Sequence, residues 1–269
     1  MEPFQAKDPS FLMIDKWKRI SPRLQAGIST RFGGVSPDSF SSLNLGFHVP
    51  DSKNNVLQNR RILAEKLNIP LHSWIMGEQI HGTSISVVSK GQAGLGAFNH
   101  ADALAGVDGM ITQDSGVLCV AMFADCVPLF FFDPVSGWIG IAHAGWKGTV
   151  NKMASKMVEA MSEHGVNTNE VEVVIGPCIS QAHYEVDQHV IQYIPDDVYD
   201  SVVINNGNGH FMLDLKELNY QLLVKAEVKP QNIAKTNYCT FKDDIFFSHR
   251  KDNGITGRFV GFIGYEEKT

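Results

Sequence analysis

The chain has 269 residues, of which 43% are hydrophobic and 19% charged, a composition typical of ordinary soluble globular proteins. Its 29 acidic residues outnumber its 23 basic residues, which gives a formal net charge of −6. This balance offers no positive surface for nucleic acid or for an anionic membrane. A small molecule or another protein is therefore the expected partner.

Targeting and domain signals are sparse. The amino terminus, MEPFQAKDPSFLMIDKWKRI, lacks the basic patch and apolar core of a secretory signal. The longest apolar run, at 117–124, is far shorter than the ~20 residues that span a bilayer. The four cysteines are scattered, which favours reduced thiols. We therefore expect a cytoplasmic protein, and a single domain over 1–269 because no linker-like stretch interrupts the chain.

The predicted elements begin with a helix over 52–67, where apolar residues recur at near-helical spacing after Asp51 and Ser52. Further helices are expected at 148–164 and 214–226. Short apolar runs bounded by Gly, Pro, Asp or Ser predict strands at 73–79, 84–89, 108–112, 117–123, 127–132, 138–144, 171–177 and 257–265. Strands outnumber helices and several follow one another directly, which favours a mixed sheet over βαβ alternation.

Cys126 and His143 lie at opposite ends of the two strands in ADCVPLFFFDPVSGWIGIAHAGWKG. If Pro134 and Val135 form a two-residue loop, the two side chains are cross-strand partners with Cβ atoms about 4.5–5.5 Å apart. A loop two residues longer keeps both on one face of the sheet, whereas a loop one residue longer separates them. The pair can be two zinc ligands, or a nucleophile with its base. The structural alternative is a buried free cysteine beside a hydrogen-bonded histidine.

His81 offers a third potential ligand. It lies in GEQIHGTSISVV, a Gly-flanked turn between two predicted strands, where a side chain can face a cleft from a rigid scaffold. Three protein ligands with one open position are typical of catalytic rather than structural zinc sites. Nearby aspartates could orient the imidazoles by accepting their second N–H group, and the candidates are Asp102, Asp108 and Asp125.

At this point the sequence resembles a known family, the laccase-domain proteins. These proteins were once classed as multicopper polyphenol oxidases and later recognised as purine nucleoside phosphorylases with adenosine deaminase activity. The motifs run through nearly the whole chain: TRFGGVS, SLNLGFHVPD, NRR, EQIHGT, ADAL, ADCVPLFFFDP, AHAGWKG, IGPCIS, YEV, LDL, YCT and FFSHRKDNGITGR.

The resemblance implies an α/β (α+β) fold, an αββα sandwich with mixed sheets. The family's His-Cys-His metal triad falls on His81, Cys126 and His143, which are thereby the expected catalytic residues and the ligands of one zinc ion per chain. The implied substrates are phosphate and purine nucleosides, namely adenosine, inosine, guanosine and methylthioadenosine. Copper is the alternative metal, with polyphenol oxidase chemistry.

The sequence argues against two other metal chemistries. None of the ten histidines forms the His-x-His pairs on which multicopper oxidases draw. The His-x-Glu and Pro-Cys-x-x-Cys signature of cytidine deaminases also fails, because Cys178 precedes the HYE stretch at 183–185 and no second cysteine completes the motif. A cysteine hydrolase that uses Cys126 as nucleophile and His143 as base stays open.

Phosphorolysis requires groups that hold phosphate and orient the ribose as charge develops. Basic residues in the motif stretches are the expected phosphate contacts, although a solvated surface position is the alternative for each: Arg31, Arg60, Lys147 and Arg250. Many relatives carry an arginine at the position of Lys147, so the charge is kept without the planar fork. Asn44 is the candidate for bonding the ribose or the base, with a local turn bond as its alternative.

Overall fold

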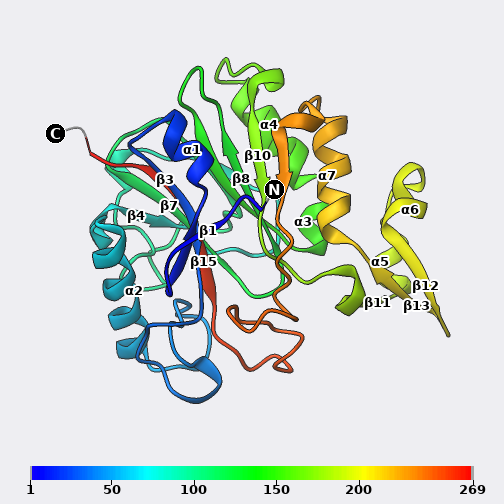
Figure 1. Cartoon of the computed structure of the whole chain (residues 1–269), viewed down its shortest axis with the longest axis horizontal. Helices are drawn as coiled ribbons and strands as arrows, with labels where there is room; N and C mark the ends of the chain where they lie inside the picture. The colour runs from blue at the N-terminus through cyan, green and yellow to red at the C-terminus, as the bar shows by residue number, and fades with distance from the viewer. Residues whose placement is uncertain (1, 268–269) are drawn as a thin grey trace.

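The computed structural model describes residues 2–267, so the ends of the predicted 1–269 domain, residues 1 and 268–269, lie outside the described residues. Two six-stranded sheets form the centre of the molecule (Figure 1). The first has the order β1 (Gln5–Asp8), β2 (Phe11–Met13), β3 (Leu24–Ser29), β15 (Phe259–Tyr265), β7 (Val117–Phe123) and β4 (Trp74–Met76). The second has the order β14 (Ile233–Lys235), β10 (Glu172–Ile175), β8 (Val127–Phe132), β9 (Ile139–Ala144), β6 (Gly109–Thr112) and β5 (Ile85–Val87).

Both sheets are mixed, because parallel pairs join otherwise antiparallel ladders. In the first sheet β4 runs parallel to β7, and in the second β5 runs parallel to β6 and β10 to β14. Helix α2 (Lys53–Leu67) packs on the outer face of the first sheet. The outer face of the second sheet carries α3 (Trp146–Val150), α4 (Met153–Ser162) and α7 (Leu215–Lys225). The predicted αββα sandwich is confirmed.

Alternation along the strands sorts side chains into the layers of this sandwich. On β8, Phe130 and Phe132 point into the core between the two sheets, whereas Leu129 and Phe131 point toward the helices. On β9, Ile141 faces the core between the sheets. The same parity carries Cys126 and His143 to the side between the sheets.

The β8–β9 hairpin has a longer loop than the two-residue turn considered above. Asp133 N donates to Trp138 O at 2.8 Å, which leaves a four-residue loop at 134–137. His143 is therefore paired with Pro128 and not with Cys126, so the direct pairing was wrong by two residues. An even shift preserves the face, so the expectation that both side chains share one face is confirmed.

Most predicted strands and the helices at 52–67 and 214–226 are confirmed. The helix expected over 148–164 is broken between α3 and α4, where Lys152 has φ 65°. Elements that the sequence did not predict include β1, β2, β3 and the short helix α1 (Asp15–Ile20). Single 3₁₀ turns occur at Asp38–Phe40, Leu71–Ser73, Lys90–Gln92, Thr168–Glu170, Gln181–His183 and Pro230–Asn232.

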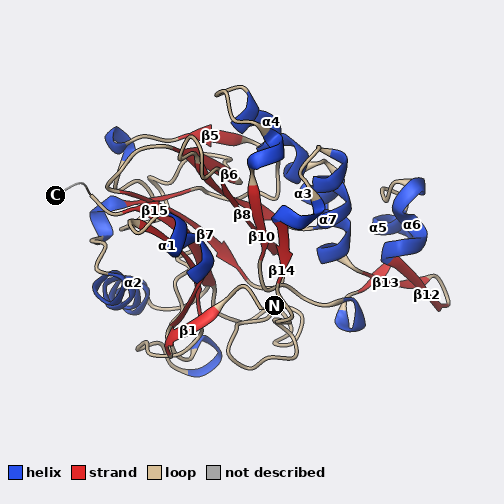
Figure 2. Cartoon of the chain, turned by 45° about the horizontal axis from the view of Figure 1, so that its top comes forward, coloured by secondary structure: helices blue, strands red, loops and turns tan. Residues whose placement is uncertain are grey.

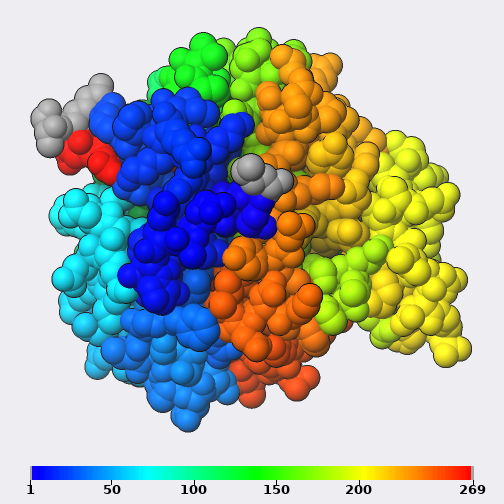
Figure 3. All heavy atoms as spheres, viewed as in Figure 1, coloured from blue at the N-terminus to red at the C-terminus, as the bar shows by residue number. Residues whose placement is uncertain are grey.

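A small lobe projects from the sandwich on the side of α7 (Figures 2 and 3). Its three-stranded sheet has the order β11 (Glu185–Asp187), β13 (His210–Leu213) and β12 (Val203–Gly207), covered by α5 (Gln188–Ile191) and α6 (Asp196–Val202). Apolar side chains of the lobe join the core beneath α4 and α7. Over residues 2–267, each helix is too short or too polar to cross a membrane.

Candidate metal centre and substrate cleft

Three side chains that are distant in the sequence meet at one end of the two sheets. His81 lies in the loop between β4 and β5, Cys126 immediately precedes β8, and His143 lies on β9. Their potential ligand atoms all lie within 4.8 Å of one another. His143 is buried, Cys126 half-buried and His81 exposed, so the group opens to solvent on the His81 side. The structure thus brings together the triad expected from the sequence.

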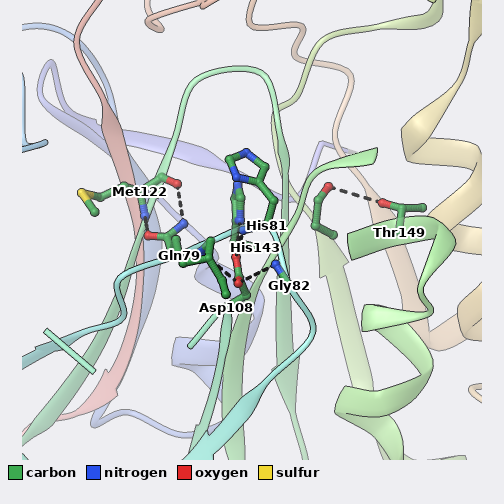
Figure 4. Close-up of polar contacts among 9 residues, drawn as sticks. Gln79, His81, Gly82, Asp108, Met122, His143 and Thr149 are labelled. Atoms are coloured by element: carbon green, nitrogen blue, oxygen red, sulfur yellow. Dashed lines mark hydrogen bonds and ion pairs between the residues drawn. The ribbon is translucent and has the colours of Figure 1, made fainter. Parts of the chain in front are cut away.

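Asp108 holds both histidines of this group (Figure 4). Its Oδ1 lies 2.8 Å from His143 Nδ1 and accepts the backbone N–H of His81 at 3.1 Å. Its Oδ2 accepts the N–H groups of Ile80 at 3.1 Å and Gly82 at 2.8 Å. The carboxylate therefore fixes the loop that carries His81, and an N–H bond from Nδ1 of His143 leaves Nε2 free for a metal.

The other two aspartates considered from the sequence act on loops. Asp102 accepts the N–H of Gly96 at 3.0 Å. Asp125 accepts the Thr240 hydroxyl at 2.6 Å and the Arg250 N–H at 2.7 Å. Asp125 also has φ 85°, a left-handed conformation that is costly for a residue with a side chain. These bonds stabilise the turn that presents Cys126.

The electrostatics of the group favour an ionised thiol. Burial alone would raise the pKa of Cys126, but the charge of His143 and hydrogen bonds from both histidines lower it to about 6. Burial would lower the pKa of His143, but Cys126 and Asp108 together raise it to about 9. Two imidazoles and a thiolate are the donor types that Zn²⁺ takes in proteins. The residues present therefore fit a metal ion with one open position.

Gly145 gives the group the space it needs. A Cβ atom at this position would lie 2.9 Å from Cys126 Sγ and 3.0 Å from His81 Cδ2. Such distances are shorter than van der Waals contact, so any side chain here would push on two of the three potential ligands. The Gly in AHAGWKG thus has a steric reason.

A cavity of about 550 Å³ opens beside the triad, within the size range of ligand pockets. Besides the triad, several basic side chains line it: His48, His100, His249, Arg250 and Arg258. A second hollow of about 290 Å³ shares Ile80, His81, Cys126 and Tyr184 with it and adds Trp146 and Lys147. Burial raises the pKa of the shared Tyr184, so its hydroxyl keeps its proton. The triad therefore borders two hollows, each of which has at least one cationic side chain in its lining.

The expected phosphate contacts fall into two groups. Arg250 lines the larger cavity, where its guanidinium packs over Tyr184 at 5.2 Å, and Lys147 lines the second hollow. Arg31 lies outside both, with Nε bonded to Ser41 O at 2.9 Å and its guanidinium over Phe247. Arg250 and Lys147 therefore line the hollows beside the triad, whereas Arg31 does not.

Arg60 and Asn44 are structural residues, in contrast to the substrate contacts expected from the sequence. Arg60 is 1% exposed, stacks on Phe47, and donates to the carbonyl oxygens of Leu45, Gly96 and Ala97 at 2.6–2.9 Å. Asn44 is fully buried, and its amide bonds Asp51, Gly46 and Arg258. Neither side chain lines the cavity, because each is turned toward the loop groups with which it forms hydrogen bonds.

Sequence reasoning missed several residues of the cavity. His48 and Arg258 lie within the family motifs SLNLGFHVPD and FFSHRKDNGITGR, so the resemblance could have indicated them. His100 lies in none of the quoted motifs. Gln79 exchanges two hydrogen bonds with the backbone of Met122, at 2.8 and 2.7 Å (Figure 4). His183 stacks on Phe241 and Cys178 is buried, so the two residues of the incomplete deaminase signature have packing roles.

Comparisons with known proteins agree with this architecture. Residues 25–266 match the family model described as multi-copper polyphenol oxidoreductase laccase. The purine nucleoside phosphorylase YlmD of Bacillus subtilis is 39% identical over 98% of each chain. That of Geobacillus stearothermophilus is 41% identical over 90% of each.

Two solved structures share the fold over nearly the whole chain. The hypothetical protein YfiH of Bacillus licheniformis has a TM-score of 0.95 and 40% identity, and covers 99% of this chain and all of its own. YlmD of Geobacillus stearothermophilus has a TM-score of 0.93 and 38% identity over the same shares.

Proposed function

Because the chain belongs to the multi-copper polyphenol oxidoreductase laccase family, we propose that it is a zinc-dependent purine nucleoside phosphorylase that also deaminates adenosine. The observation that carries the proposal is the His81, Cys126 and His143 group beside a cavity with cationic walls. The names of the curated relatives supply the reaction class. Adenosine, inosine, guanosine and methylthioadenosine are the proposed nucleosides.

Zinc is proposed over copper because of the types of ligand atom and because the described part of the chain offers a single three-ligand group. One thiolate and two imidazoles form a three-ligand group, as in catalytic zinc sites with an open position. Across residues 2–267, the structure assembles this one group of His, Cys, Asp or Glu side chains at metal-binding distance. A multicopper centre would need several more imidazoles.

In the proposed phosphorolysis, a phosphate oxygen forms a bond to C1′ of the ribose while the C1′–N9 bond breaks. The electron pair of that bond leaves with the purine, which takes up a proton, and the products are ribose 1-phosphate and free base. Arg250 lines the larger cavity and Lys147 the second hollow, which supports both as contacts for anionic groups. The protonated Tyr184 hydroxyl, in the lining of both hollows, is a neutral hydrogen-bond donor.

In the proposed deamination, water adds to C6 of adenine and ammonia leaves. A zinc ion held by His81, Cys126 and His143 would supply Lewis-acid activation when bound. Asp108 keeps His143 in one tautomer and His81 in one loop conformation, so the ligand geometry is set before any substrate arrives.

A cysteine hydrolase is the second candidate, and the lowered pKa of Cys126 beside His143 favours it. The two proposals differ in what Cys126 does, since a metal ligand cannot also attack an acyl group. Zinc bound at one ion per purified chain would exclude the hydrolase. Activity on acyl substrates that survives chelation would support it.

The decisive experiment is chromatography of the products from adenosine and from inosine, with and without phosphate. We expect inosine from adenosine in either buffer, and ribose 1-phosphate with free base only when phosphate is present. The Arg250→Gln variant should lose base release more than deamination, because deamination uses no phosphate. Free ribose formed at an undiminished rate without phosphate would replace the phosphorylase proposal with a nucleoside hydrolase.

A further inference from the structure

Arg258 is a half-buried cation on the wall of the cavity. Its Nη1 donates to its neighbours' carbonyl oxygens, Thr256 O and Gly257 O, both at 3.0 Å. Over residues 2–267, no carboxylate forms an ion pair with it. Removing a guanidinium from water is costly unless an anion meets it. The molecule therefore keeps a guanidinium in this cavity that no carboxylate of the described chain contacts directly, although the charges of Cys126 and Asp125 act on it from a distance.

A loop distant in the sequence, at residues 44–46, holds Arg258 in place. Asn44 Oδ1 accepts the N–H groups of Arg258 at 2.9 Å and Gly46 at 3.1 Å, and Leu45 N donates to Arg258 O at 2.9 Å. A Cβ atom on Gly46 would lie 2.7 Å from Arg258 Cγ. The loop leaves room for the aliphatic part of Arg258 only because residue 46 has no side chain. The buried Asn44 fixes this loop against the backbone of Arg258.

His48 adds a neutral donor to the same wall. The Gly46 Cβ would lie 3.3 Å from His48 Cε1, so His48 and Arg258 flank one glycine. Burial and then the charge of Arg258 lower the pKa of His48 to about 4, so its imidazole is neutral at pH 7. Behind it, the buried Arg60 is bonded only to carbonyl oxygens and Met122 sulfur and raises the positive potential further.

The two acidic residues that line the cavity bond groups other than Arg258 and His48. Glu78 is exposed at the rim and accepts the N–H of Gly106. Asp125 accepts hydrogen bonds from the Thr240 hydroxyl and the Arg250 backbone N–H.

We propose that Arg258 and His48 form the subsite that binds inorganic phosphate in this cavity, an inference that rests on the proposed phosphorolysis. A guanidinium fork matches two phosphate oxygens, and the imidazole N–H can donate to a third.

The position of the subsite suits the reaction. Arg258 and His48 line the same cavity as His81, Cys126 and His143, so the subsite and the metal triad open onto one space. A phosphate held there lies beside a nucleoside whose base is at the triad, which is the proximity that a two-substrate displacement requires.

The test is calorimetric titration of the zinc-loaded protein with inorganic phosphate, together with the phosphate KM for base release from inosine. Arg258→Gln should weaken phosphate binding and raise this KM roughly tenfold or more. Arg258→Lys, which retains the charge without the fork, should fall between Arg258→Gln and the wild type. Arg61→Gln, the same change on the exposed face of α2, is the matched control and should bind phosphate as the wild type does.

Zinc content and melting temperature establish that each variant is folded, and Arg258→Lys keeps the test valid if Arg258→Gln fails to fold. Wild-type phosphate affinity in folded Arg258→Gln and Arg258→Lys would overturn the subsite while leaving the phosphorylase proposal intact. No saturable phosphate binding by the wild type would also overturn it. Phosphate binding that Arg258→Gln abolishes, in a protein whose base release needs no phosphate, would retain the anion subsite and reject phosphorolysis.

Discussion

At the scale of single residues, one carboxylate links the positions of two proposed ligands. Asp108 lies close to His143 Nδ1 and accepts three consecutive N–H groups of the loop that carries His81. The positive φ of His81, 61°, directs these N–H groups toward one point, as in an anion nest. Movement of Asp108 would therefore displace both histidines together.

The first prediction concerns the metal. Replacing Cys126 by Ala should abolish stoichiometric zinc while the chain stays folded, because two imidazoles alone hold the ion far less tightly. Zinc content by elemental analysis and folding by circular dichroism give the result. Cys119→Ala is the control, since Cys119 is a buried thiol of β7 whose burial raises its pKa to about 12. An unchanged zinc content in Cys126→Ala would remove Cys126 from the ligand set.

The second prediction follows from the lowered pKa of His48. The native imidazole takes up its proton near pH 4, whereas the unfolded one does so near 6.5. Between these values the unfolded state binds more protons, so the free energy of unfolding falls as pH drops from about 6.5 to about 4, by roughly 3 kcal/mol. Urea unfolding of the wild type and of His48→Gln in phosphate-free buffer measures the difference. Parallel pH profiles for the two proteins would contradict it.

From the residues alone, His81, Cys126 and His143 were possible metal ligands beside other readings, and the resemblance to the laccase-domain family singled them out as a triad. The structure brings the three side chains together. The proposed phosphate contacts were harder to predict, because Arg60 and Arg258 differ only in their surroundings. Arg60 lies on α2 and is enclosed by carbonyl oxygens of neighbouring loops, whereas Arg258 faces a cavity. Burial of an arginine depends on distant loops, and sequence periodicity does not reveal it.

At the scale of elements, the β8–β9 hairpin sets the spacing of the triad. Its four-residue loop places Pro128 opposite His143, so Cys126 is a diagonal neighbour of His143 and extends toward Gly145. The sequence predicted the shared face because alternation is robust to an even shift. It could not fix the loop length, because the side chain of Asp133 bonds Val135 N and Ser136 N and stabilises a wider turn.

The third prediction tests the space beside this hairpin. Gly145→Ala should reduce zinc affinity about ten- to hundredfold, because its methyl group would displace Cys126 or His81 by a few tenths of an ångström or more. Competition with a chelator of known affinity measures the change. Gly91→Ala is the control, since its Cβ would meet only Ser89 Oγ at 3.8 Å. Equal affinity in both variants would show that the ligands tolerate a side chain at residue 145.

Long apolar runs made β7, β8 and β9 predictable, whereas the missed strands are short or mixed. The exposed residues of β1 and the polar stretch of β12 show no alternation, and these strands form through pairing with β2 and β13. The interruption between α3 and α4 depends on Lys152 in a left-handed conformation, which no glycine or proline marked in the sequence.

At the scale of the whole molecule, a strand from the carboxyl-terminal end of the chain joins the two parts of the first sheet. β15 lies between β3 and β7 and pairs antiparallel with both. Its side chains are buried on both faces, toward α2 and toward the second sheet. The same segment leads into the sheet directly from Arg258, so closure of the core and completion of the cavity depend on one piece of chain.

The fourth prediction follows from this connection. A chain that ends at residue 257 should lose cooperative unfolding and zinc binding together, because β3 and β7 would each lose a buried partner. Thermal denaturation and elemental analysis test both. The control is an insertion of two glycines between Asn208 and Gly209, in the exposed turn of the lobe, which should change the melting temperature by only a few degrees. A cooperative, zinc-binding truncated protein would contradict the prediction.

The central position of β15 also governs how the protein is made. During synthesis, β7 is complete at Phe123, but its antiparallel partner β15 begins only at Phe259. At about 5–20 residues per second, roughly 7 to 30 seconds separate the two. For that time the nascent chain carries apolar strand edges that the finished molecule buries, and these can pair with another chain. Self-association in the cell is therefore a hazard of the unfinished polypeptide, and it ends when the last strand is inserted.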